Sequence, residues 1–287
     1  DFSASQGAVP REPDAVAWLD DGNFVTANEG DWNGGSRSFT IWSRDGQVVH
    51  EDAGAFEKAI VPTGHYPDGR SDNKGAEPEA VITAEYDGQK LMFLAAERAS
   101  LVGVYDVADP AAPKLLQLLP SGIGPEGLVA IPQRNLFATA NETDLGEDGA
   151  ARAHVTIFER SEGQANWPQI VADAGIGWGA LSGLAVDAAT PTTLYAVSDS
   201  VYGAAPAIFT IDASAMPAKI TQKTIVTRDG NPAEKLDLEG IAVDPAGGCW
   251  TRARSWRRAS ALKGPRSSTA SCGWRFSANG RTTPRGR

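Results

Sequence analysis

Short apolar runs rich in β-branched and aromatic side chains dominate the hydrophobic pattern of this chain. Clear runs occupy 24–26, 39–42, 91–94, 102–105, 155–158 and 207–211. Asp21-Gly22, Asp45-Gly46 and Asp87-Gly88 stand between such runs and are typical hairpin turns. Apolar residues at helical spacing occur only around 53–60. The pattern therefore predicts an all-β chain of short strands.

A short phrase with an acidic second residue recurs along the chain. Its copies are Pro13-Asp14-Ala15-Val16, Pro78-Glu79-Ala80-Val81, Pro125-Glu126-Gly127-Leu128, Leu181-Ser182-Gly183-Leu184 and Leu238-Glu239-Gly240-Ile241. They open units at about 13–52, 78–119, 125–172 and 181–227, and a fifth unit at Leu238. Units of this length with four strands each predict the blades of a β-propeller. A β-sandwich is the alternative, but it does not explain the repeated phrase.

The repeat breaks down near residue 250, inside the fifth unit. Residues 251–287 contain nine Arg, one Lys and no acid, where an apolar strand ending in a carboxylate is expected. We predict an incomplete propeller domain over 1–250, with four full blades and a broken fifth. Residues 251–287 then form an aberrant basic tail, disordered or read out of frame. The alternative is a natural basic tail that binds nucleic acid or an acidic surface.

The charge of the body differs sharply from that of the tail. Residues 1–250 hold 16 basic and 36 acidic residues, a net charge of −20. Such a body disfavours nucleic acid and suits a cation-binding, exported protein. No run approaches the roughly 18 apolar residues of a membrane span. The chain opens at Asp1 without Met, so we expect a secreted or periplasmic protein whose signal peptide is not in the chain.

Several phrases resemble two related groups of bacterial β-propellers. The phrases at 25–31, 70–81, 96–98 and 104–106 resemble choice-of-anchor I proteins. Those at 181–187, 194–199 and 237–242 resemble the phytase-like (esterase-like) domain. The resemblance covers about 10–250 and implies an exported propeller that hydrolyses phosphoesters. The chain departs from the pattern at Glu79-Ala80, where the family has a second Glu-Gly, and in lacking blades after the fifth.

In a propeller, a residue at one repeat position appears once per blade around the central channel. The first such ring comprises Asp14, Glu79, Glu126 and Glu239, with Ser182 in the fourth unit. The second ring comprises Glu29, Glu97, Glu142 and Asp199, which close the second run of each unit. The first ring either binds metal or accepts backbone hydrogen bonds from the neighbouring blade.

Clustered carboxylates repel one another unless a cation neutralises them. Oxygen ligands without His or Cys favour Ca²⁺ or Mg²⁺. We therefore expect Ca²⁺ at the second ring, with Asp31 and Asp144 as further ligands. Asn28 and Asn141, which precede two of the ring acids, are either part of this site or turn formers.

Phosphoester hydrolysis would also need cationic side chains that hold the substrate. Arg98 follows a ring acid, while His65, Arg70 and Lys74 lie on the long loop 62–77, so these four are candidate substrate ligands. The alternative for each is a solvated loop charge. The sequence names no catalytic residue, because it lacks the serine-hydrolase elbow, the P-loop and the His-Glu-x-x-His motif. Two hypotheses follow: a Ca²⁺-dependent hydrolase of a small phosphorylated molecule, and a non-catalytic surface propeller that binds a ligand or protein partner.

Overall fold

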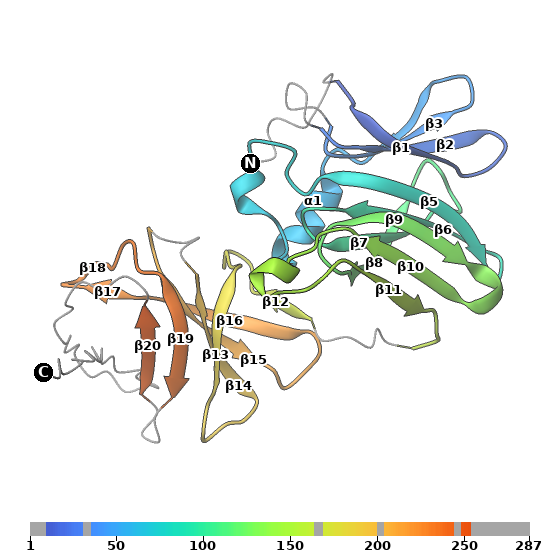
Figure 1. Ribbon diagram of the computed structural model, residues 1–287. Coiled ribbons are helices and arrows are strands. Elements are labelled where there is room, and N and C mark those ends of the chain that lie inside the picture. The colour runs from blue at the N-terminus through green and yellow to red at the C-terminus, as the bar shows by residue number, and fades with distance from the viewer. Residues whose placement is uncertain (1–9, 31–35, 164–168, 200–203, 244–247, 254–287) are drawn as a thin grey trace, which may run out of the picture. The chain divides into compact units, whose positions relative to one another are not determined.

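The computed structural model describes residues 10–30, 36–163, 169–199, 204–243 and 248–253. Strands dominate this part of the chain, and α1 (Ala55–Ile60) is its single α-helix (Figure 1). The all-β prediction is confirmed. No helix in the described ranges has the length and apolar character of a membrane span. The chain divides into two compact units, 1–165 and 166–287. Each is described here by itself, and a single propeller domain over 1–250 stays a prediction.

Two four-stranded antiparallel sheets open the first unit. The first sheet consists of β1 (Pro13–Trp18), β2 (Asn23–Asn28), β3 (Ser38–Ser43) and β4 (Val48–Glu51). The second consists of β5 (Pro78–Tyr86), β6 (Gln89–Ala96), β7 (Leu101–Asp106) and β8 (Lys114–Pro120). Asp87 and Gly88 both have positive φ, as the turn between β5 and β6 requires. These meanders confirm the first two predicted units.

The third sheet has three strands, β9 (Pro125–Ile131), β10 (Leu136–Asn141) and β11 (His154–Glu159). We expected a fourth strand before residue 172, and this prediction is wrong. The strand in question, β12 (Ile170–Ala172), pairs in parallel with β16 (Ala218–Ile225) of the second unit. Ten residues separate β11 from β12. No tight turn therefore forces these two strands to pair, as the hairpin turns do for other neighbouring strands.

The second unit contains the fourth meander and the beginning of a fifth. The fourth consists of β13 (Leu181–Val186), β14 (Thr193–Ser198), β15 (Ala207–Asp212) and β16. β17 (Thr227–Arg228) and β18 (Asn231–Pro232) form a small hairpin. β19 (Leu238–Val243) pairs with β20 (Cys249–Ala253). Residues 254–287 lie outside the described ranges, so the out-of-frame tail stays a prediction.

Sheets of the first unit pack face to face. Val25, Ala27, Phe39 and Ile41 of the first sheet form one core with Val81, Met92, Leu94 and Tyr105 of the second. The opposite face of the second sheet packs on the third, where Phe93 stacks on Phe137 at 4.2 Å between centroids. Helix α1 adds Phe56 and Ile60 to the first core. A Cβ at Gly103 would lie 2.7 Å from Phe56 Cε2, so this close approach requires glycine.

Every copy of the repeated phrase contains a β-bulge. The pairing register skips one residue in each sheet, leaving Asp14, Glu79, Glu126, Ser182 and Glu239 without a partner on the adjacent strand. A bulge bends the strand and changes the direction of the extra side chain. The second residue of the phrase, an acid in every unit but the fourth, is therefore the bulged residue at the start of the first strand of each repeat.

A backbone hydrogen bond joins the bulge region to the end of the second strand in four units. The strand-ending acid donates its N–H to the carbonyl oxygen of the residue two positions before the bulge. The pairs are Glu29 to Glu12 at 2.9 Å, Glu97 to Glu77 at 2.9 Å, Glu142 to Gly124 at 2.9 Å and Asp199 to Ala180 at 2.8 Å. This bond places the two predicted sets of acids at the same end of each sheet.

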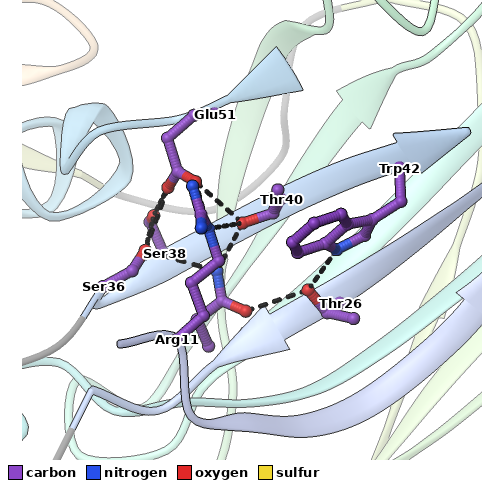
Figure 2. A network of polar contacts seen from close by, with 8 residues as sticks. Arg11, Thr26, Ser36, Ser38, Thr40, Trp42 and Glu51 are labelled. Carbon is purple, nitrogen blue, oxygen red and sulfur yellow. Dashed lines mark hydrogen bonds and ion pairs between the residues drawn. The ribbon is translucent and has the colours of Figure 1, made fainter. Parts of the chain in front are cut away.

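Asn28 and Asn141 are not turn formers. Each ends a strand and bridges to the next strand of its sheet, because Asn28 Nδ2 donates to Thr40 Oγ1 at 2.8 Å and Asn141 Nδ2 to Thr156 Oγ1 at 3.0 Å. In the first sheet this contact belongs to a larger network shown in Figure 2. Arg11 Nε donates there to Glu51 Oε2 at 2.7 Å. The network ties the segment before β1 to β4.

Candidate functional site

Three glutamates of the second sheet converge at one end of β5 and β6. A carboxylate oxygen from each of Glu77, Glu79 and Glu97 lies within 4.8 Å of the others. Glu79 is the bulged residue of β5, Glu77 precedes that strand, and Glu97 follows β6. The bulge and the Glu97–Glu77 backbone bond together produce this convergence.

Acids from the neighbouring sheets extend this group. The charges of Glu142 and Glu79 raise the pKa of Glu126, after the larger effect of its partial burial. Burial is the main cause of the raised pKa values of Glu97 and Glu79. The charge of Glu142 further raises the pKa of Glu97, and the charge of Asp14 further raises that of Glu79. We call Glu79, Glu97, Glu126 and Glu142 the acidic cluster. It draws two members from each of the two predicted rings.

Three cationic side chains meet at Glu77, which stands beside the acidic cluster. Its carboxylate accepts hydrogen bonds from Arg70 Nη2 at 2.5 Å, Arg98 Nε at 2.9 Å and Lys74 Nζ at 3.1 Å. Burial alone would raise the pKa of Glu77, but its bonds to Arg98 and Lys74 outweigh burial and lower the pKa. Glu77 is therefore ionised, and its carboxylate oxygens are already occupied by three cationic donors. This leaves it poorly suited to bind a metal.

The predicted ligand Glu29 is also paired. Its carboxylate accepts a hydrogen bond from Lys74 Nζ, which links the first sheet to the loop before β5. Burial would lower the pKa of Lys74, but its bonds to Glu29 and Glu77 raise it beyond the ordinary range. A cation at this position already neutralises Glu29.

Glu97 and Glu79 differ from these paired acids. Both carboxylate oxygens of Glu97 are buried, and neither accepts a hydrogen bond of good geometry from a described residue. Arg98 Nη1 approaches Glu97 Oε1 at 2.6 Å, as an ion pair. Burial raises the pKa of Glu97, while burial and the facing Glu97 carboxylate raise the pKa of Glu79 to about 8. Such a pair takes up either a proton or a metal cation at neutral pH.

Some acids at this end of the sheets are neutralised by ion pairs, and others are not. The three cations Arg70, Lys74 and Arg98 contact Glu29, Glu77 and Glu97, so these charges cancel. Glu79, Glu126 and Glu142 have no ion pair with a described Lys, Arg or His. The acidic cluster thus retains negative charge that a divalent cation would neutralise.

A buried support holds the loop that carries Arg70, Lys74 and Glu77. Glu57 of α1 accepts the N–H of Ala76 at 2.8 Å, and Arg37 Nη1 donates to the Ser71 carbonyl oxygen at 2.7 Å. A Cβ at Gly75 would lie 2.1 Å from Glu57 Oε1, and Gly75 has a φ of 58°. Glycine is therefore required where the loop crosses Glu57.

The other predicted site residues lie elsewhere. His65 is exposed, and its Nδ1 lies 3.0 Å from the Ala99 carbonyl oxygen. Asp144 accepts the N–H of Gly146 and pairs with Arg152 at 3.0 Å within its own loop. Asp31 lies outside the described residues. Asp199 and Glu239 belong to the second unit, so their membership of a common ring stays a prediction.

Ser182 occupies the bulge position of the fourth unit. Its Oγ donates to the carbonyl oxygen of Leu238, which precedes the bulged residue of the next unit. This contact joins consecutive repeats, but it differs from the expected one, in which an acid accepts a hydrogen bond from a backbone N–H. Glu79 is different, because its Oε2 is buried without a hydrogen-bond donor among the described residues.

Sequence reasoning missed the central role of Glu77. Its signal was available: it stands two residues before the bulge acid, and the two loop cations Arg70 and Lys74 lie just upstream. What the sequence could not show is that three cations converge on this one carboxylate rather than on a substrate.

Two family models match parts of the chain. Residues 32–110 match the choice-of-anchor I domain, and residues 176–251 match the family described as esterase-like activity of phytase. These are the two groups that the sequence resembles, so that prediction is confirmed. The comparison with curated proteins finds no match.

Solved structures show only a distant likeness. The hydrazine synthase of Kuenenia stuttgartiensis is 14% identical, with 85% of this chain and 56% of that chain covered and a TM-score of 0.33. A putative 6-phosphogluconolactonase from Bacteroides uniformis is 18% identical, with coverage of 82% and 61% and a TM-score of 0.34. The periplasmic gluconolactonase of Pseudomonas aeruginosa is 12% identical, with coverage of 84% and 65% and a TM-score of 0.30. The chain spans less than two thirds of each, and TM-scores this low support no argument.

Proposed function

We propose that this chain is part of an exported β-propeller that binds Ca²⁺ in its acidic cluster and hydrolyses phosphoesters there. One observation carries the proposal: Glu79, Glu97, Glu126 and Glu142 gather at one end of two adjacent sheets with too few cations to neutralise them. The match of residues 176–251 to the family described as esterase-like activity of phytase supports this reaction class. The choice-of-anchor match at 32–110 supports export.

The donor set fits calcium. It consists of carboxylate oxygens without nearby His or Cys among the described residues, and Glu97 Oε2 is buried without a hydrogen-bond donor there. When bound, Ca²⁺ would polarise phosphate oxygens and lower the pKa of a coordinated water. Glu79, Glu97, Glu126 and Glu142 would hold the ion, while Glu77 and Glu29 keep the neighbouring cations in place.

Arg98 is the best placed candidate ligand for the substrate. Its side chain is 40% exposed although its Nε and Nη1 contact Glu77 and Glu97. A guanidinium held in this way remains charged and oriented beside the cation site, as phosphate recognition requires. Arg70 and Lys74 support it through Glu77, with His65 at the rim of the same loop as a weaker candidate.

Calcium titration and phosphomonoesterase assays of the full chain test the proposal. Glu97→Gln and Glu142→Gln should weaken Ca²⁺ binding and lower turnover by at least about 10-fold, a common loss when a metal site is disturbed. Asp144→Asn is the matched control, because this acid is already used within its own loop. Equal losses in the control would show that the cluster is not the site.

The second candidate is a non-catalytic extracellular propeller that binds a ligand or protein partner through the same acidic end. The pairing of Arg70, Lys74 and Arg98 with glutamates favours it, because none of these three described cations is left unpaired for a substrate. Ca²⁺ binding without turnover on a panel of phosphoesters would support this candidate and exclude the hydrolase.

A further inference from the structure

The connection that leads into the second sheet is much longer than the one that leads into the third. The strand β4 ends at Glu51 and β5 begins at Pro78, whereas β8 ends at Pro120 and β9 begins at Pro125. The long connection contains α1, whose Glu57 is fully buried and hydrogen-bonds to the end of the same connection. Because burial of a carboxylate is costly, this contact calls for an explanation.

Ala76 lies between Glu57 and the residues that follow β6. Glu57 Oε1 accepts the N–H of Ala76 at 2.8 Å, and the carbonyl oxygen of Ala76 accepts the N–H of Arg98 at 3.2 Å. The next residue, Glu77, accepts the Glu97 N–H at 2.9 Å through its carbonyl oxygen and Arg98 Nε at 2.9 Å through its carboxylate. Glu57 is thus linked through the backbone of Ala76 and Glu77 to the buried carboxylate of Glu97 and to the guanidinium of Arg98.

The loop is held tightly where it passes α1. Gly75 crosses Glu57 so closely that a Cβ there would lie 2.1 Å from Glu57 Oε1. Arg37, which is also buried, holds the same loop by donating from Nη1 to the Ser71 carbonyl oxygen at 2.7 Å. Two buried side chains therefore fix the path of the loop before it reaches Glu77.

The third sheet shows that the backbone plan itself does not need this support. There the N–H of Thr143 donates to the Ile123 carbonyl oxygen at 3.3 Å, which is the equivalent of the Arg98 bond in the second sheet. This bond forms after a connection, 121–124, that contains no α-helix. The fold alone therefore does not account for Glu57. What distinguishes the second sheet is the arginine that follows its strand-ending acid, where the third sheet has Thr143.

We propose that Glu57 is a positioning residue, which acts through Ala76 to fix Glu97 and Arg98 at the acidic cluster. The inference rests on the proposed function, in which Glu97 binds Ca²⁺ and Arg98 binds the phosphate of the substrate. Glu57 itself touches neither ligand. Residues that orient metal ligands from behind typically change metal affinity or activity by about 10- to 100-fold when they are removed, and we expect an effect of this size here.

Glu57→Leu in the full chain tests the proposal, because leucine fills the buried site but cannot accept the Ala76 N–H. It should weaken Ca²⁺ binding and raise KM for p-nitrophenyl phosphate, each by about 10-fold. Glu57→Gln keeps an acceptor oxygen and should restore both values to those of the wild type. Gly75→Ala presses a methyl group against Glu57 Oε1 and should have the same effect as Glu57→Leu. Phe56→Leu is the matched control, since it weakens the core side of the same helix and should lower Tm without changing Ca²⁺ affinity.

Hydrogen exchange separates a failure of this inference from a failure of the proposed function, because it requires neither Ca²⁺ nor turnover. In Glu57→Leu the Arg98 amide should exchange about 10-fold faster relative to the amides of β6, since the hydrogen bond that protects it is loosened. In Glu57→Gln it should exchange at the wild-type rate.

An unchanged Arg98 amide in Glu57→Leu would overturn the proposal, and so would faster exchange with unchanged Ca²⁺ affinity and KM. Equal losses in Glu57→Gln would assign the effect to charge, and equal losses in Phe56→Leu would assign it to the stability of α1; either result excludes a positioning role. A wild type that binds no Ca²⁺ contradicts the proposed function, and the exchange rates then still decide whether Glu57 positions Arg98.

Discussion

Glu77 combines an unusual backbone with an unusual set of partners. Its φ of 57° lies in the left-handed region, which a residue with a side chain rarely adopts. The equivalent residues of the third and fourth units are Gly124, with φ 69°, and Ala180, with φ 45°, so three units share this conformation. Side-chain exposure of Glu77 is 2%, and three cations contact its carboxylate. The ion pairs offset the cost of a strained, buried carboxylate.

Glu77→Gln should destabilise the protein by about 2–4 kcal/mol, because it leaves three cations facing a neutral amide. Urea denaturation measures the loss. Glu85→Gln, at an exposed position of β5, should change stability little and serves as the control. A loss below about 0.5 kcal/mol, the range of ordinary surface substitutions, would show that Glu77 does not organise the cations.

Asp52 gives the protein a specific pH dependence. Its carboxylate accepts the Phe56 N–H at 2.9 Å, and burial raises its pKa to about 6. The folded state therefore keeps a proton that the unfolded chain releases above pH 3.8. The stability from this proton is complete below that pH. This contribution is lost as the pH rises from 3.8 to about 6. Above about pH 6 Asp52 no longer makes stability depend on pH.

Asp52→Asn should remove this dependence, because an amide can accept the same N–H without ionising. We expect the variant to exceed the wild type by about 1–3 kcal/mol above pH 6 and to match it near pH 4. Thermal or urea unfolding at several pH values measures the difference. A constant difference across the pH range would assign the effect to packing rather than to ionisation.

At the scale of elements, the repeat is defined by polar details as much as by apolar strands. Five bulges and four backbone bonds recur at the same positions. The first and third sheets add a buried Asn that bridges two strands. The second sheet has Ala96 there instead, within its apolar core. The three sheets therefore share the same backbone pairing but stabilise the end of the second strand with different side chains.

Asn28→Ala and Asn141→Ala should each cost about 1–3 kcal/mol, because each leaves buried hydroxyl or carbonyl groups without a partner. Asn141 alone holds Thr139 Oγ1, Thr156 Oγ1 and the His154 carbonyl oxygen. Asn231→Ala, at an exposed position of β18, is the control. Losses no larger than the control's would show that the bridges contribute no stability.

At the scale of the whole molecule, the two compact units and the position of the acidic cluster have a joint consequence. The cluster lies entirely within the first unit, 1–165. A ligand that binds only the folded state stabilises it by about 2.7 kcal/mol at 100 times its dissociation constant. In a domain of this size, 1 kcal/mol raises Tm by about 2–4 °C.

Calorimetry should therefore resolve two unfolding transitions, and Ca²⁺ should raise the Tm of only one of them. Glu97→Gln should abolish that rise and leave the other transition unchanged. EDTA and Mg²⁺ serve as comparisons, because a nonspecific effect of ionic strength would move both transitions. One cooperative transition that shifts as a whole would show that the units unfold together.

Much of the candidate site was readable from the repeated phrase. Glu79, Glu97, Glu126 and Glu142 all came from two repeat positions, and the structure brings these four together. The sequence did not predict that Glu29, Arg70 and Lys74 form ion pairs with one another and with Glu77. Their contacts with metal or substrate stay predictions. Ion pairs between distant segments leave no periodic trace in a sequence.

The sequence by itself determined the strands, their hairpins and the recurrence of acids, because these depend on side-chain alternation and local turn chemistry. Only the tertiary structure decided how the acids are used. The bulges redirect the phrase residues, and the loop held by Glu57 and Arg37 delivers cations to Glu77 but not to Glu79. The tertiary structure also decided that β12 pairs with β16, because a strand that follows a long connection can pair with any open sheet edge.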